Sequence, residues 1–194
     1  MNTGGSPLTD QEIRNCIFRG LSDSHFFSKL KSLANNNKYL DLVSLSQKQL
    51  SEKYNEELIL RFFSLYDNID NTQSIKGNMS KHMDHYMKET VEKDSFNSNL
   101  DTLFLRIIDV LSPLGGSIFR FKNNIFSTSL FDAITLGVGL NISYYEDKDK
   151  EELLKIIDDL KTDDDFRKYT GSASSSKSRV VNRIKIAKDR FRVD

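Results

Sequence analysis

The chain has 194 residues, enough to bury a sizeable core as one large domain or two small ones. Its 28 Lys and Arg residues balance 28 Asp and Glu residues, so overall charge does not favour nucleic acid or a membrane surface as the partner. No apolar run approaches the length of a membrane span, no signal peptide is visible, and the single cysteine, Cys16, excludes an internal disulfide framework. We therefore expect a soluble protein of the reducing cytosol.

Composition favours helix over sheet. The chain holds only two prolines, and it is rich in Leu, Ile, Lys and Glu, which lose little rotamer freedom in a helix. An all-α fold of about eight helices follows, with at most one short β element near residues 117–126, where Phe119 and Phe121 alternate weakly with polar residues.

The first predicted helix begins at a capping box. Residues 1–8 are expected to be an extended lead-in from a missing amino-terminal domain, and residues 9–194 the helical domain. Thr9 is typical of an N-cap, and Glu12 three residues later is placed to accept from the cap amide. Ile13, Cys16 and Ile17 share one face of this helix, so we expect that face to lie in the core.

The remaining predicted helices follow from apolar residues at helical spacing. The strongest covers residues 55–66 and is apolar nearly all round at its centre, which predicts burial on more than one side. The others are expected over 24–34, 39–45, 79–91, 96–111, 129–139 and 148–160, with a last helix carrying Val180, Ile184, Ala187 and Phe191.

Three segments carry a resemblance to a known family. The opening run from Asn2 to Asn15, NTGGSPLTDQEIRN, resembles the INxGGxxLxxQEIRN signature that closes the conserved core of the GmrSD-type restriction endonuclease N-terminal family, domain of unknown function 262. The run from Glu57 to Tyr66, ELILRFFSLY, is similar to the family's helix of the ELVLRFLAxY type. The run from Ser176 to Ile184 is similar to its weaker closing pattern.

The resemblance implies a role without catalysis. In the family, a ParB- or sulfiredoxin-like fold with a DGQQR motif precedes this region, and many members carry a downstream HNH-type nuclease module. Neither motif occurs in this chain. What the resemblance implies is a helical module of a phage-defence or modification-dependent restriction protein. It would scaffold the missing NTPase and nuclease parts and contact DNA or a partner subunit, with no catalytic residue and no cofactor of its own.

Two other functions stay open at this point. One is an independent helical protein–protein interaction domain with no tie to restriction, which an open apolar groove would favour. The other is an enzyme fragment that keeps part of a nucleotide pocket. Gly4 and Gly5 permit a tight turn before a helix amino terminus, which would form an anion site together with Asn2 and Arg14. The alternative for the same residues is a structural turn that feeds a capped helix.

The carboxy-terminal segment is the candidate DNA-contacting element. Basic residues gathered on an exposed helix can neutralise phosphates. Two alternatives stay open: the acidic run over 146–165 is their partner within the chain, or both segments are solvated surface. The basic residues are Lys177, Arg179, Arg183, Lys185, Lys188 and Arg190.

No metal site is expected. His82 and His85 lie three residues apart on a predicted helix, a spacing that can place two imidazoles on one metal. Their neighbours Met79, Met83 and Met87 are typical of core packing instead.

Overall fold

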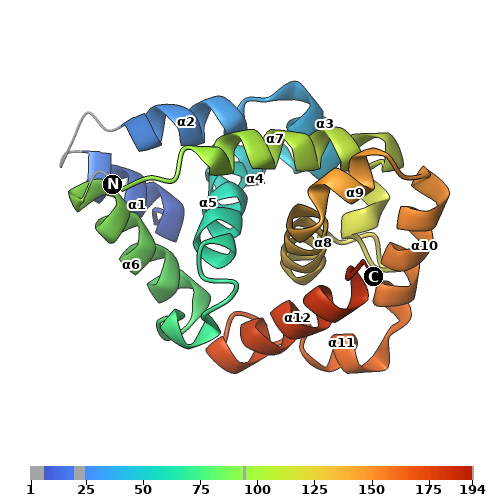
Figure 1. Ribbon diagram of the computed structural model, residues 1–194. Helices are drawn as coiled ribbons and strands as arrows, with labels where there is room; N and C mark the ends of the chain where they lie inside the picture. Colours follow the sequence, from blue (N-terminus) through green and yellow to red (C-terminus); the bar gives the residue numbers. More distant parts are fainter. Residues whose placement is uncertain (1–6, 20–24, 94, 194) are drawn as a thin grey trace, which may run out of the picture.

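The computed structural model describes residues 7–19, 25–93 and 95–193, and within them the fold is all-α (Figure 1). These residues form twelve α-helices and three short 3-10 helices, and contain no β-strand. The predicted fold class is confirmed, whereas the expected number of about eight helices is too low. The difference is made by short helices, among them α4 (Gln47–Ser51), α9 (Ile142–Glu146) and α11 (Asp164–Lys168).

The region expected to hold a short β element is a turn. Residues Gly116–Phe119 form the 3-10 helix η3, and the backbone then makes a single antiparallel bridge between Arg120 and Phe126. The alternation of Phe119 and Phe121 has another cause: Phe119 is buried in the core, and Phe121 lies half-buried in the loop.

Two helices form the centre of the molecule. Every residue of α5 (Tyr54–Tyr66) from Leu58 to Leu65 is buried, as its continuous apolar sequence predicts. Every residue of α8 (Thr128–Leu140) from Ser129 to Gly139 is buried as well. The two helices pack against each other and carry the main apolar core.

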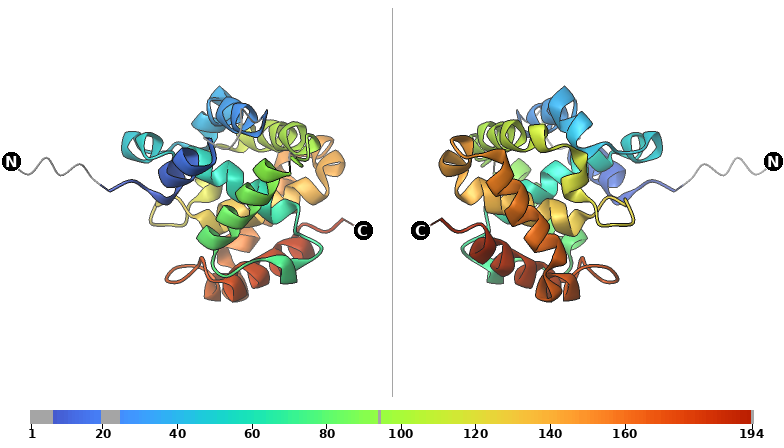
Figure 2. Two further views of the ribbon diagram at one scale, coloured as in Figure 1. Left: turned by 90° about the vertical axis from the view of Figure 1, so that its left-hand side faces the viewer. Right: turned by 90° about the vertical axis from the view of Figure 1, so that its right-hand side faces the viewer.

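The other helices surround this pair. In the two side views, α2 and α7 lie above the centre and α12 lies below it (Figure 2). The surrounding long helices are α1 (Asp10–Arg19), α2 (His25–Ala34), α3 (Asn37–Val43), α6 (Met79–Glu92), α7 (Asn99–Leu111), α10 (Lys150–Thr162) and α12 (Lys177–Arg190), and the remaining 3-10 helices are η1 (Thr72–Ser74) and η2 (Ser112–Leu114).

Helix α12 packs closely along α8. A Cβ added to Gly137 would meet the ring of Phe191 at 2.3 Å, so the absent side chain permits this approach. The backbone oxygen of Phe191 accepts hydrogen bonds from Asn141 and Tyr145, both at 3.0 Å. These contacts hold the end of α12 against the centre.

Charged side chains also join the central helices. The carboxylate of Asp132 on α8 accepts two hydrogen bonds from Arg61 on α5, at 3.0 and 2.6 Å, and one from Arg183 on α12 at 3.2 Å. All three side chains are buried, with 3%, 5% and 1% of the surface of Asp132, Arg61 and Arg183 exposed. Burial works against the charge of Arg61, but the attraction and hydrogen bonds of Asp132 raise its pKa above the ordinary value.

No helix among the described residues is both long and apolar enough to cross a membrane.

Candidate functional site

The expected capping box opens α1. The carboxylate of Glu12 accepts from the backbone amide of Thr9 at 2.8 Å, and the hydroxyl of Thr9 accepts from the amide of Glu12 at 3.3 Å. The same hydroxyl lies 3.0 Å from the backbone oxygen of Glu52, beyond the end of α4. The start of α1 is thereby tied to the body of the protein.

The inner face of α1 is polar. Arg14 is buried, and its guanidinium donates to Asp84 at 2.6 Å and to the hydroxyl of Ser80 at 2.7 Å. It also reaches Glu57 at 3.4 Å and Gln11 at 3.2 Å. Arg14 therefore links α1 to α5 and α6 by charge-assisted hydrogen bonds.

A second polar chain continues along the same face. The amide of Gln11 donates to Asn15 at 3.1 Å, and the amide of Asn15 donates to Glu56 at 2.7 Å. All three side chains are buried. Phe18 adds the one apolar residue of this face that is buried among the described part of α1.

The outer face of α1 is apolar and exposed, which reverses the expected orientation. Ile13 and Ile17 are 42% and 57% exposed, Leu8 just before the helix is 57% exposed, and Cys16 is exposed beside them. The expectation that Ile13, Cys16 and Ile17 lie in the core is wrong. Gln11, Arg14 and Asn15 form a second face of the helix, also at helical spacing. Arg14 and Asn15 find their hydrogen-bond partners on α5 and α6, so this polar face, and not the apolar one, is turned toward the protein.

The proposed anion site is only partly within the described residues. Asn2, Gly4 and Gly5 lie outside them. Arg14 is described, and its guanidinium is bonded to Asp84, Ser80, Gln11 and Glu57 rather than directed at an open site. Its bonds favour a structural role.

The carboxy-terminal basic residues do not form an open basic face. Arg183 is buried and donates to the backbone oxygens of Tyr169 at 2.8 Å and Ser174 at 2.7 Å as well as to Asp132, so the expectation of an exposed Arg183 is wrong. Burial lowers the pKa of Arg183, and the nearby Arg61 adds to that effect against the attraction of Asp132.

Most of the other basic residues of α12 are also engaged. Lys188 pairs with Asp70 at 2.9 Å, and Arg190 pairs with Asp163, one residue of the acidic run. Lys177 donates to the backbone oxygen of Gln73 at 2.8 Å, and Arg179 donates to that of Lys168, also at 2.8 Å. Lys185 is exposed and makes no ion pair with any described residue.

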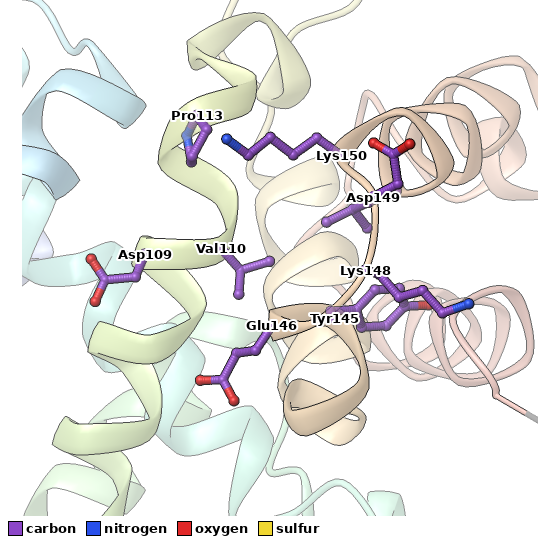
Figure 3. A pocket seen from close by; sticks show the side chains of 9 residues that line it. Asp109, Val110, Pro113, Tyr145, Glu146, Lys148, Asp149 and Lys150 are labelled. Carbon is purple, nitrogen blue, oxygen red and sulfur yellow. The ribbon is translucent and has the colours of Figure 1, made fainter.

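A small pocket of about 200 Å³ lies between α7, η2, α9 and the start of α10 (Figure 3). Its charges are largely matched: Glu146 forms a bidentate pair with Arg106 at 2.7 and 2.6 Å, and Asp109 pairs with Lys38 at 2.5 Å. Lys148 lies over the ring of Tyr144 at 4.5 Å. With these groups occupied, the pocket offers a ligand little charge to bind.

The two histidines lie in different environments. His82 is buried, with Nε2 3.2 Å from the backbone oxygen of Ser64, whereas His85 is exposed. The described residues contain no group of three or more His, Cys, Asp and Glu side chains that could hold a metal ion.

Comparison with known proteins identifies no relative. No family model matches the chain, and no curated protein or solved structure matches it either. The candidate site therefore rests on its own geometry: a helix held by buried polar groups that presents its apolar face outward.

Proposed function

We propose that this chain is a non-catalytic helical module of a GmrSD-like phage-defence or restriction protein, and that the outer face of α1 binds the domain that precedes it. The resemblance of the opening segment supports this assignment, since in that family a catalytic domain lies directly before the matching residues. The lone cysteine, exposed and unpaired in the described chain, is consistent with the reducing cytosol in which we place the protein.

The observation that carries the proposal is the reversed orientation of α1. Three large apolar side chains are exposed in this segment: Leu8 just before α1, and Ile13 and Ile17 one helical turn apart on it. Together with Cys16 they are named here the α1 outer face. Exposed large apolar side chains that gather on one element are typical of a protein interaction site. Because the inner face is fixed by Arg14 and Asn15, α1 cannot turn to bury these residues without losing those bonds.

Binding across this face is tested with the preceding domain produced as a separate polypeptide. We expect the double variant Ile13→Glu/Ile17→Glu to weaken its binding by about tenfold or more, because two partly exposed apolar side chains would no longer be buried on association. The matched control is Leu105→Glu/Leu154→Glu, which changes two exposed apolar residues on α7 and α10. Calorimetry measures both affinities.

Equal affinity of the two double variants would contradict the proposal. So would a parent gene with no domain encoded before this segment.

The same exposed face also suits the second candidate function, an independent helical protein–protein interaction domain. In that case the occupant is a separate protein, and the preceding domain, if present, leaves the α1 outer face open. The two functions are separated by whether the chain joined to its preceding domain still exposes Ile13 and Ile17 to solvent, measured by hydrogen exchange of α1.

Contact with DNA through α12 receives little support from the geometry. Arg183 is buried, and four other cations of the predicted set are bonded within the chain. Lys185 is the one that is exposed and makes no ion pair with a described residue. We propose that any DNA contact of the parent protein runs through its other domains. Lys185→Glu is then expected to leave duplex binding by the whole protein unchanged in a salt series.

A further inference from the structure

A basic hollow of the described chain is lined by residues outside the basic helix α12. A pocket of about 650 Å³ opens between η3, the loop that follows it and the ends of α10 and α11. This volume lies in the range of small-molecule sites. Its lining residues are Ser117, Arg120, Phe121, Lys122, Asn124, Asp158, Lys161, Thr162 and Arg167.

Positive charge dominates this pocket. Four cations line it against the single carboxylate of Asp158, which lies 3.3 Å from Lys161. Within the part of the chain that the structure describes, Arg120, Lys122 and Arg167 form no ion pair with a carboxylate. Their charge is therefore not cancelled by a carboxylate, unlike that of Arg183, Lys188 and Arg190 on α12.

Two of the four basic groups, Arg120 and Lys161, are held in place by backbone oxygens. The guanidinium of Arg120 donates to the backbone oxygens of Gly116, Val43 and Ser44 at 2.5, 2.8 and 2.9 Å. Lys161 donates to the backbone oxygen of Ser117 at 3.0 Å and is only 17% exposed. These partners orient the two cations: the carbonyls leave the charge of Arg120 in place, whereas Asp158 offsets part of the charge of Lys161.

The pocket also offers a flat surface. The guanidinium of Arg167 lies 5.9 Å from the centre of the Phe121 ring, and Phe121 is half-buried at the wall. An aromatic ring with a neighbouring Arg is the surface on which nucleic-acid bases stack. Asn124, held at a positive φ of 58° in the same loop, adds an amide that can read the edge of a ring.

We propose that this pocket binds a nucleoside phosphate, with the phosphate near Lys122 and Lys161, the base against Phe121 and Arg167, and Arg120 adding positive charge at the wall. The concave shape favours a small ligand over a nucleic-acid strand, since the cations surround one hollow. This inference is independent of the α1 outer face, because it rests on other residues.

The experiment measures binding of ADP to the whole chain by isothermal titration calorimetry. We expect Lys122→Ala/Arg167→Ala to weaken ADP binding by about tenfold or more, since each removes a charged contact. Both side chains are exposed, so the fold should survive, and thermal unfolding checks this. The matched control, Lys155→Ala/Lys168→Ala, removes two exposed cations of α10 and α11 outside the pocket and should change affinity less than about twofold.

Three comparisons make the result decisive. Adenosine should bind at least about tenfold more weakly than ADP, and Phe121→Leu should weaken ADP and leave the affinity for inorganic phosphate unchanged. No ADP binding up to millimolar concentration, or equal loss in the pocket and control variants, would overturn the proposal. Binding of a short oligothymidylate that ADP does not displace, and that Lys122→Ala/Arg167→Ala abolishes, would also overturn it in favour of a single-strand site.

Discussion

At the scale of single residues, the buried charges decide how the centre is held. Asp132 sits between two guanidinium groups, so the triad carries more positive than negative charge inside the protein. The backbone oxygens of Tyr169 and Ser174 offset part of this excess at Arg183, whereas its Nε has no partner among the described residues. A single carboxylate thus joins α5, α8 and α12.

Asp132→Asn is expected to destabilise the protein by about 3–5 kcal/mol, because it removes the only carboxylate to which both buried guanidinium groups are bonded among the described residues. The control Asp70→Asn breaks the pair with Lys188, but Asp70 is 88% exposed, so the loss should stay below about 1 kcal/mol. Urea unfolding of the two variants measures both values. Equal losses would show that the triad contributes no more than a surface pair.

His82 is expected to make stability depend on pH. Burial lowers its pKa below the ordinary value of 6.5, with the nearby His85, Lys177 and Arg61 acting in the same direction against the hydrogen bond to Ser64. The unfolded chain then binds a proton more readily than the folded one, so stability falls as pH drops below about 6.5.

His82→Gln should flatten this dependence between about pH 6.5 and 5, whereas His85→Gln, on the exposed side of the same helix, should retain it. Denaturant unfolding across that window measures the slopes. An unchanged slope in His82→Gln would assign the pH dependence to other groups.

At the scale of elements, α1 shows why an apolar stripe alone does not orient a helix. Ile13 and Ile17 share one face and Gln11, Arg14 and Asn15 share another, so the sequence contains two stripes. The partners that select the polar stripe, Glu56, Glu57 and Asp84, lie more than forty residues away along the chain. No local pattern could have paired them.

In α1, replacing a polar residue should therefore destabilise the protein more than replacing an apolar one. Arg14→Met should cost about 1–3 kcal/mol of unfolding free energy because Glu57 and Ser80 lose a buried donor, while Ile17→Ser should change it by less than about 0.5 kcal/mol. Thermal and urea unfolding compare the two. A larger loss in Ile17→Ser would mean that the apolar face packs inward.

Length decided which other elements could be predicted. The long helices α5, α7 and α10 repeat their apolar spacing over thirteen residues each, which is enough to predict them from the chain alone. The five-residue helices α4 and α9 complete barely one turn. Helix α4 is instead marked by the capping box of Ser46 and Gln49, a signal that the apolar pattern does not contain.

At the scale of the whole molecule, the net charge is balanced, but the cations without a carboxylate partner are unevenly distributed over the protein. Three cations of α12, Arg183, Lys188 and Arg190, pair with carboxylates of distant segments, such as Asp70 and Asp132. In the pocket lined by Phe121, three of the four cations have no carboxylate partner among the described residues, although the four are scattered between residues 120 and 167 of the sequence. A basic run along the chain and a basic surface in space are therefore different features of this protein.

The most direct test of the proposed docking role is the alkylation rate of Cys16, the single thiol of the chain and an exposed member of the α1 outer face. We predict rapid reaction with a maleimide in the isolated chain, and strong slowing when the preceding domain is present, with normal reaction restored by Ile13→Glu. An alkylation rate that the preceding domain leaves unchanged would contradict the account.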